Sequence, residues 1–278
     1  DVPIQAENRP GPASRGHSLE MFIILKEMRH ECMTKFIMNG CNGAMGQVIT
    51  RLAAETPDVE IVAGIDVADN RDNGYPVYTR PEDCKVEADV IVDFSIAKAV
   101  DGIVDYAVAR QLPLVLCTTG LTDEQIEYVN EQSKKVAILR SANMSLGVNT
   151  LFKLAAIGAK ILGAAGYDME IVEKHHNKKV DAPSGTALAI ADAVNDAMDH
   201  AYTYKLDRSK DRVKRDPKEI GIQAVRGGTI VGEHELFFCG PDEVVEIKHT
   251  AYSKGIFAKG AIEAAAYLKG KEPGLYTM

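Results

Sequence analysis

The stretch TKFIMNGCNGAMGQVITRLAAE, residues 34–55, decides the fold of this 278-residue chain. It begins with an apolar run that ends in glycine, as a buried strand does, and residues 44–55 place apolar residues at helical spacing. The junction GCNGAMG is a G-x-x-G-x-x-G variant of the glycine pattern that accepts the pyrophosphate of a dinucleotide. Because glycines let the backbone approach a phosphate at a helix N-terminus, the stretch predicts a strand–loop–helix nucleotide site.

The residues that follow repeat the alternation of strand and helix. Thr122 and Gln125 have the spacing of a capping box at the start of one of these helices. Strands that are apolar throughout and alternate with helices predict a parallel sheet covered on both faces. The apolar runs are 59–66, 88–95, 112–120 and 136–144, and the helical patterns between them are 97–111 and 122–135.

The pattern changes after residue 144. A long helix (146–165), a strand (167–176) and a helix (184–199) precede three strand-like runs with glycine turns, which favours an antiparallel or mixed sheet. We therefore predict an α/β chain with a Rossmann-like parallel-sheet dinucleotide domain and a smaller α+β domain for substrate and oligomerisation. The predicted division is 33–144 with 254–278 for the first domain, 145–253 for the second, and 1–32 as a tag or upstream segment outside the fold.

The composition is that of an acidic globular protein. The formal net charge is −8 and the pI is about 5.4, which disfavours nucleic acid and anionic membranes as partners, because both would repel the chain. No stretch approaches the roughly 20 apolar residues that a membrane span requires. The five cysteines are widely spaced and include no C-x-x-C pair, which predicts reduced thiols, a cytoplasmic location and no structural zinc.

A carboxylate stands where a contact to the adenosine ribose is expected. Asp66 ends the second apolar run, 20 residues after Gly46. The same carboxylate repels a 2′-phosphate, and the next residue is Val67, with Arg71 the nearest arginine. We therefore predict that NADH is used at least as well as NADPH. The alternative is a glycine turn needed only for close packing, with a solvated Asp66.

Two further strand ends fit a nucleotide site. CTTG (117–120) and SANMSLGVN (141–149) both follow apolar runs, at the edge where open parallel sheets bind ligands. Either one could be an ordinary turn. Together they suit the lining of a nicotinamide cleft.

The stretch EKHHNKKVDAPSGTA, residues 173–187, concentrates positive charge in an acidic protein. A solvated basic loop is one interpretation, and an anion site at a helix start is another. A third is zinc bound by His175 and His176 with His200, His234 or His249. Because neighbouring residues of a strand point to opposite faces, adjacent histidines chelate one ion poorly, and we predict no metal.

The anion-site interpretation depends on the helix start. Pro183 and Ser184 suit the first positions of a helix, and the N–H groups of Ser184, Gly185 and Thr186 would then face an anion. Lys179 adds a charge, and histidines can donate a proton near neutral pH. Joined to a dinucleotide domain, the site predicts hydride transfer to a C=C or C=N bond, completed by an acid.

The chain also resembles a known family. VEKHHNKKVDAPSGTA, residues 172–187, is similar to the signature of the 4-hydroxy-tetrahydrodipicolinate reductases, also called dihydrodipicolinate reductases. The resemblance runs from about Lys35 to Met278 and includes GCNGAMG, CTTG, SANMSLGVN, VRGGTIVGEH and FAKGAIEAAAYLKGKEPGLYTM. It implies reduction of a small dicarboxylate, 4-hydroxy-tetrahydrodipicolinate, to tetrahydrodipicolinate in the diaminopimelate and lysine pathway. It also implies NADH or NADPH as coenzyme and a homotetramer assembled through the C-terminal sheet.

The resemblance implies roles for single residues. His175 would donate the proton, and Lys179 would be a second catalytic group that also holds a substrate carboxylate. Cys117, Met144 and Val67 depart from residues found in some relatives, so the coenzyme preference stays open. The predicted substrate-binding residues are His176, Lys179, Ser184, Gly185 and Thr186. The predicted coenzyme-binding residues are Gly40, Cys41, Asn42, Gly43, Ala44, Met45, Asp66, Cys117, Thr118, Thr119, Ser141, Ala142, Asn143 and Met144.

Two alternatives use the same nucleotide domain. Another dinucleotide-linked dehydrogenase, for an amino acid or a semialdehyde, would keep GCNGAMG but has no need of HHNKKVDAPSGT. A non-catalytic dinucleotide sensor would bind the coenzyme and tolerate loss of the histidines.

Overall fold

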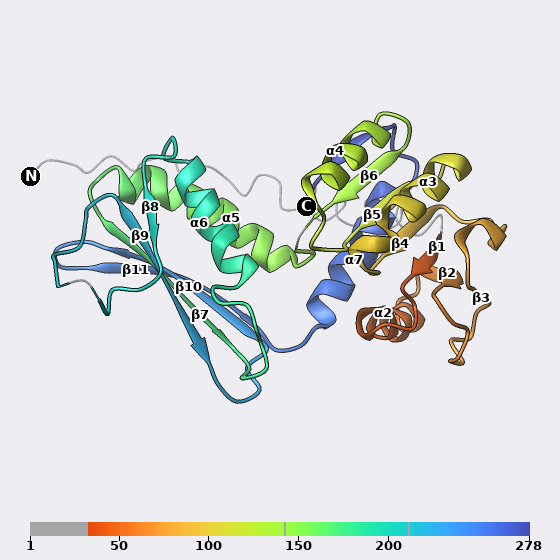
Figure 1. Ribbon diagram of the computed structural model, residues 1–278, viewed down its shortest axis with the longest axis horizontal. Helices are drawn as coiled ribbons and strands as arrows, with labels where there is room; N and C mark the ends of the chain where they lie inside the picture. Colours follow the sequence, from red (N-terminus) through yellow and green to blue (C-terminus); the bar gives the residue numbers. More distant parts are fainter. Residues whose placement is uncertain (1–32, 142, 211) are drawn as a thin grey trace, which may run out of the picture.

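The computed structural model describes residues 33–141, 143–210 and 212–278. Within them the chain forms two sheets, each with its own helices (Figure 1). The predicted extension 1–32 lies outside the described residues. In Figure 1 the middle of the chain, from α5 to β11, forms the unit on the left, and helix α7 returns to the unit on the right.

The first sheet is parallel and has the order β12-β6-β5-β4-β1-β2-β3. The chain runs outward from β1 to β3 and then from β4 in the other direction, so the order reverses between β1 and β4. At such a point the loops after the two strands separate and leave a crevice for a ligand. The strands are β1 (Thr34–Asn39), β2 (Val59–Ile65), β3 (Val77–Tyr78), β4 (Val90–Asp93), β5 (Leu114–Leu116), β6 (Ala137–Arg140) and β12 (Gly274–Tyr276).

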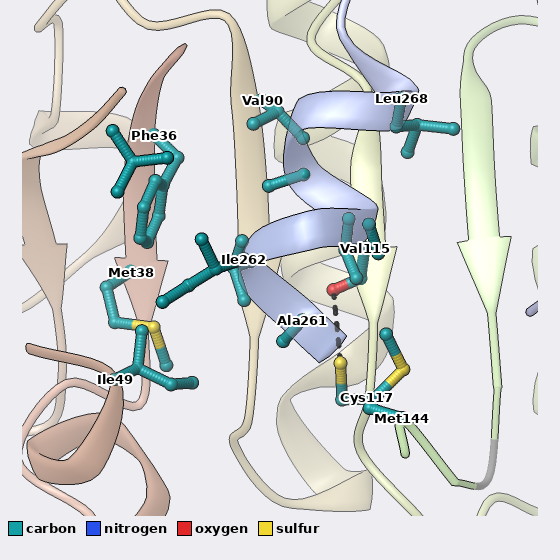
Figure 2. Packing of buried hydrophobic residues seen from close by; sticks show 14 of the residues in the cluster. Phe36, Met38, Ile49, Val90, Val115, Cys117, Met144, Ala261, Ile262 and Leu268 are labelled. Carbon is teal, nitrogen blue, oxygen red and sulfur yellow. Dashed lines mark hydrogen bonds between the residues drawn. The ribbon is translucent and has the colours of Figure 1, made fainter. Parts of the chain in front are cut away.

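Helices cover both faces of this sheet, which is why its strands are apolar throughout. Phe36 and Met38 pack with α2 and α7 on one face, and Ile37 packs with α3 and α4 on the other. Figure 2 shows Ala261 and Ile262 of α7 among the residues of the first face. The predicted doubly covered parallel sheet is confirmed. The helices are α2 (Ala44–Ala54), α3 (Val100–Arg110), α4 (Asp123–Gln132), α7 (Gly255–Leu268) and the short 3₁₀ turns η1 (Pro81–Asp83) and η2 (Ala97–Ala99).

The second sheet is mixed and has the order β11-β10-β7-β9-β8. Its strand β10 runs antiparallel to β7 and β11, whereas β9 runs parallel to β7 and β8. Helices α5 and α6 cover one face, and no helix in the described part of the chain covers the other (Figure 1). The predicted mixed-sheet domain is thus confirmed. Its elements are α5 (Leu146–Gly158), the π-helical η3 (Ala159–Gly163), β7 (Asp168–His175), α6 (Gly185–Asp196), β8 (Thr203–Lys205), β9 (Glu219–Arg226), β10 (Gly232–Cys239) and β11 (Val244–Ala251).

The helix expected over 146–165 differs in detail. Its regular part ends at Gly158, where a Cβ would lie 2.7 Å from the Phe238 ring, and a π-helical segment continues it to Gly163. By length and composition the segment Leu146–Gly163 could cross a membrane, so the expectation that no stretch is long enough is wrong for this helix. Leu151 and Ala155 of this segment pack in the core of the second sheet, although only 28% of the segment is buried.

Candidate active site

The loop after β1 needs its first and third glycines for space. Gly40 has φ +80°, and a Cβ there would lie 2.5 Å from the carbonyl oxygen of Phe94. A Cβ on Gly46 would lie 2.2 Å from the carbonyl oxygen of Gly40. The glycines therefore bring the loop against β4 and bring α2 against the loop, which sets the helix N-terminus at the end of the strands.

The first turn of α2 faces a cavity of about 700 Å³. The residue before the helix is Gly43, which has no side chain to cap the N–H groups of the first turn. Those groups and the positive end of the helix can accept a pyrophosphate. The cavity is lined by Asn39, Gly40, Asn42, Gly43, Ala44, Met45, Ile65, Asp66, Val67, Thr79, Pro81, Phe94, Ser95, Ile96, Ala99, Ile103, Cys117, Thr118 and Thr119.

Asp66 lines this cavity one residue after β2. Its carboxylate accepts hydrogen bonds from the backbone N–H of Asn42 and of Val67, both at 2.8 Å. These bonds fix the carboxylate and leave its remaining lone pairs for a ribose hydroxyl. The Val67 side chain is 91% exposed and offers no charge beside it.

A buried carboxylate joins the loops on either side of the crevice. Asp93, at the end of β4, accepts hydrogen bonds from the side chains of Asn39 (2.6 Å) and Thr118 (2.6 Å) and from the N–H of Ser95 (3.2 Å). Burial raises the pKa of Asp93, although these hydrogen bonds act in the opposite direction. Asp93 thus ties the ends of β1, β4 and β5 together beneath the cavity.

Four of the other predicted coenzyme residues lie in different surroundings. Cys41 is fully buried behind the loop, and burial raises the pKa of its thiol to about 11. Ser141 lines a smaller adjoining hollow of about 150 Å³. Met144 does not line the cavity, because its side chain is buried in the first core beside Cys117 (Figure 2). Ala142 lies outside the described residues.

The basic stretch forms a turn at the carboxyl end of β7. The strand ends at His175, so the side chain of His176 need not point to the opposite face of the sheet, as it would within a strand. The N–H of Lys179 donates to the carbonyl of His176 at 3.1 Å, and the Lys179 ammonium lies 2.9 Å from a carboxylate oxygen of Asp181. The Nδ1 atom of His176 is buried and has no hydrogen-bond partner within the described residues.

His175 is 8% exposed and contacts a fully buried carboxylate. Its Nδ1 lies 2.6 Å from Oε2 of Glu173. Burial lowers the pKa of His175, while the hydrogen bond and charge of Glu173 raise it, and the net shift is downward. Arg226 of β9 donates to both oxygens of Glu173, at 2.8 and 2.7 Å.

The start of α6 differs from the prediction at one residue. Ser184 is the N-cap, and its side chain accepts from the N–H of Ala187 at 3.2 Å. The expectation that the N–H of Ser184 is unpaired is wrong, because it donates to Glu173 at 2.9 Å. The N–H groups of Gly185 and Thr186 have no acceptor within the described residues, and a Cβ on Gly185 would meet open space.

The structure brings only some of the predicted coenzyme-binding residues into contact with the predicted substrate-binding residues. The side-chain amide of Asn143 donates to the hydroxyl of Thr186 at 3.2 Å, which joins the end of the first sheet to the start of α6. The residues that line the large cavity all come from 39–119, so His175 and Lys179 do not line it.

Three further histidines lie within the described residues. His234 of β10 stands edge-on to His175 and lies 3.0 Å from the hydroxyl of Ser184, and its pKa is lowered to about 4, mainly by burial. His200 is on the surface after α6, and His249 lies opposite His234 on β11. Among the described residues no three His, Cys, Asp or Glu side chains are placed to hold a metal ion.

Sequence reasoning missed several residues of both sites. Glu173 is two positions before His175, so strand alternation already places both on one face of the sheet. Asp93 is a charged residue at the end of an apolar run, which is a weaker signal. Arg226 and His234 reach the site through the pairing of β7 with β9 and β10, and nothing local in the sequence indicates that pairing.

A parallel sheet with a glycine loop and a carboxylate beside it, joined to a mixed-sheet domain with an imidazole and an ammonium, is typical of a two-domain pyridine-nucleotide-dependent oxidoreductase. The models of the two parts of dihydrodipicolinate reductase match this chain, the N-terminal part over residues 34–144 and the C-terminal part over 147–278. The chain belongs to the dihydrodipicolinate reductase family, as the resemblance predicted.

Named relatives align with most of this chain and with nearly all of their own length. The chain is 50% identical over 246 residues to the 4-hydroxy-tetrahydrodipicolinate reductase of Caldanaerobacter subterraneus subsp. tengcongensis, covering 88% of this chain and 97% of that one. It is 40% identical to the enzyme of the same name from Aquifex aeolicus, with the same coverage. Dipicolinate-bound dihydrodipicolinate reductase from Paenisporosarcina sp. TG-14 shares the fold, with a TM-score of 0.73 at 23% identity over 88% of this chain and 97% of that one.

Proposed function

We propose that the protein reduces 4-hydroxy-tetrahydrodipicolinate to tetrahydrodipicolinate and water in the diaminopimelate and lysine pathway, with a reduced nicotinamide nucleotide as hydride donor. The observation that carries this most directly is the grouping at the carboxyl end of β7. There His175, the turn that holds Lys179, and the open N–H groups of α6 come from one segment of chain. An acid, a cation and a helix N-terminus suit a dicarboxylate that must be protonated as it is reduced.

The first domain supplies a fitting coenzyme site. A Cβ at Gly40 or Gly46 would collide with backbone, so the loop is shaped for close approach, and the first turn of α2 faces the cavity. When bound, the nicotinamide supplies the hydride. We propose that the N–H groups after Gly43 hold the pyrophosphate, that Asp66 binds the adenosine ribose, and that Cys117 to Thr119 line the nicotinamide end.

The second domain supplies the dicarboxylate site. We propose that Gly185 and Thr186 bind one substrate carboxylate through their N–H groups, with His176 as a further contact. In the ligand-free arrangement the Lys179 ammonium is paired with Asp181, which is 59% exposed in its side chain. An arriving carboxylate would compete for that ammonium, and we propose that Lys179 then changes partner. Ser184 contributes through its cap of α6 rather than through a free N–H.

His175 is the proposed acid. Loss of water from the substrate leaves an electron-poor ring, hydride adds to a ring carbon, and a proton from His175 completes the reduction. A doubly negative substrate beside the ring favours the charged imidazolium, which offsets the lowering of its pKa by burial. Bound substrate therefore prepares its own acid.

The arrangement of the two domains supports a closing step. We propose that residues 33–144 with 254–278 bind the coenzyme, that 145–253 bind the substrate, and that rotation between them brings the reactants together. The contact between Asn143 and Thr186 lies at the junction. We further propose a cytoplasmic homotetramer in which copies of the chain cover the uncovered face of the second sheet.

The test is oxidation of NADH with freshly generated substrate. We expect His175→Gln and Lys179→Ala to lower kcat by about 10²-fold or more, as for loss of an acid–base group, with coenzyme affinity unchanged. The matched controls are His200→Gln, at an exposed histidine after α6, and Lys178→Ala, one position from Lys179 and exposed.

The outcomes separate the three candidate functions. Coenzyme binding without turnover of this substrate in the wild-type protein would favour another dehydrogenase or a sensor. Turnover that survives both substitutions would place the chemistry elsewhere in the chain.

A further inference from the structure

A second carboxylate stands behind the proposed acid. Glu173 is fully buried, lies on the same face of β7 as His175, and accepts four hydrogen bonds. Their donors are both terminal nitrogens of Arg226, Nδ1 of His175 and the N–H of Ser184. A buried charge is costly unless it is paired and its lone pairs are satisfied, and here both conditions hold.

We propose that Glu173 is a positioning residue that fixes the Nδ1–H tautomer and the ring orientation of His175, so that Nε2 carries the transferable proton. This rests on the proposed function only for what the proton is used for. The tautomer itself follows from the contact between Nδ1 and the carboxylate.

The protonation of Glu173 decides the tautomer. Burial raises the pKa of Glu173, but hydrogen bonds from Arg226, His175 and Ser184 lower it by more. The pKa of Glu173 therefore lies below its usual value. An ionised carboxylate can only accept, so the Nδ1 atom 2.6 Å away must be the donor. This is the general arrangement in which a carboxylate sets the proton position of an imidazole.

The Nε2 edge of the His175 ring, opposite Glu173, is free of hydrogen bonds within the described residues. Nε2 lies beside Gly232 of β10, where an added Cβ would come within 3.1 Å of it. Gly232 thus provides the room into which Glu173 turns the ring.

The same carboxylate connects the acid to the substrate-binding helix. Its Oε1 receives the N–H of Ser184, and Arg226, which holds both oxygens, also donates to the carbonyl of Asp181 at 2.6 Å. The end of β7, the loop at Asp181 and the start of α6 therefore share one buried anion. A displacement of Glu173 would move the proton donor and the proposed carboxylate site together.

The charge of Glu173 also acts on the acidity of His175. The charged or titratable groups facing the imidazole are Glu173 on β7, Lys179 in the following turn, Arg226 on β9 and His234 on β10. His234 is neutral near pH 7 because its pKa is lowered to about 4. Lys179 and Arg226 disfavour the imidazolium, and Glu173 alone favours it.

The decisive measurement is the nitrogen NMR of His175, which needs no turnover. In the wild-type protein we expect neutral His175 to carry its proton on Nδ1. In Glu173→Gln we expect a mixture of tautomers and a pKa lower by about one unit, because the balancing charge is gone. A neutral wild-type ring protonated on Nε2, or an unchanged pKa in the variant, would overturn the proposal.

Kinetics give the second readout. Because the acid must be protonated, kcat falls as pH rises through the pKa of His175, and Glu173→Gln should move that fall to lower pH by about one unit. The matched control is Glu170→Gln, on the same strand and paired with Arg208 and Arg215 on the opposite face. We expect it to lower stability without moving the pH profile. A shift of equal size in both variants would mean that the effect is not specific to Glu173.

Two provisions keep the experiment decisive. Glu173→Gln leaves the charge of Arg226 without its buried carboxylate partner, so Glu173→Gln/Arg226→Gln, which removes both charges, replaces it if the single variant does not fold. The double variant should still lose the fixed tautomer. Failure of the wild-type protein to oxidise either NADH or NADPH with this substrate would refute the proposed function, while the NMR result would still decide the role of Glu173.

Discussion

At the residue scale, we expect the neighbours Asp66 and Val67 to determine the preference between NADH and NADPH. Asp66 lines the cavity with its carboxylate fixed by two backbone N–H groups, and Val67 beside it is exposed. A ribose hydroxyl can donate to this carboxylate, whereas a 2′-phosphate would meet like charge, and the adjacent Val67 brings no cation. Both effects favour NADH.

We therefore expect kcat/KM for NADH to equal or exceed that for NADPH. Asp66→Asn should lower kcat/KM for NADH by about tenfold, since hydrogen bonds to a charged group contribute about 1.5–3 kcal/mol, and should affect NADPH less. Val67→Arg should raise kcat/KM for NADPH.

Steady-state kinetics with both coenzymes test the predicted preference for NADH. A tenfold preference of the wild-type protein for NADPH would contradict the prediction. Arg71→Ala tests whether the nearest arginine contributes.

At the element scale, the glycine loop shows why a motif of small residues positions a helix. Gly46 belongs to the first turn of α2, and its α-carbon faces the carbonyls of Gly40 and Cys41. The helix can approach the strand end only because this side chain is absent. The cavity beside the loop depends on that approach, so packing and the proposed coenzyme binding both require a glycine at this position.

Two glycine-to-alanine changes in helices should have opposite effects. In Gly46→Ala the new Cβ would lie 2.2 Å from a backbone oxygen, and we expect lower stability and weaker NADH binding. In Gly102→Ala, within α3, the Cβ meets nothing within 4 Å. Because alanine is the better helix former, this control should be more stable by up to about 1 kcal/mol. Thermal unfolding and coenzyme titration measure both, and equal effects would contradict the packing argument.

At the scale of the whole molecule, the second sheet has one face that no helix of the described residues covers (Figure 1). Strand alternation puts Val225 and Val244 on that face, and they are 45% and 57% exposed. On the same face Lys174 and Lys248 pair with Glu233 and Glu235 across three strands. A broad face with satisfied charges and exposed valines suits contact with further copies of the chain.

Assembly through this face can be measured directly. We expect sedimentation of the wild-type protein as a tetramer, and of Val225→Glu as a smaller species, because a charge buried at an interface without a partner is destabilising. The control is Val213→Glu at another exposed valine, 80% exposed, which should leave the mass unchanged. A monomeric wild-type protein would refute the homotetramer.

The accuracy of the sequence predictions depended on whether a signal was local. The capping box at Thr122 and Gln125 is present, because both partners lie within one turn of helix. The strands β3, β8 and β12 were not predicted, since two or three residues are too few to show a period. The N–H of Ser184 was predicted to be free because its acceptor, Glu173, reaches it only through the fold.

The sequence by itself determined the alternation of apolar strands and helices, the glycine loop, the acid at residue 66 and the family. Each of these is written in neighbouring residues whose spacing reflects the period of a helix or strand. Only the tertiary structure decided that Glu173, Arg226 and His234 surround His175 and that Cys41 and Met144 face a core. It also decided that no helix of the described residues covers one face of the second sheet. Those features depend on the pairing of distant strands, which is set by the burial of whole faces.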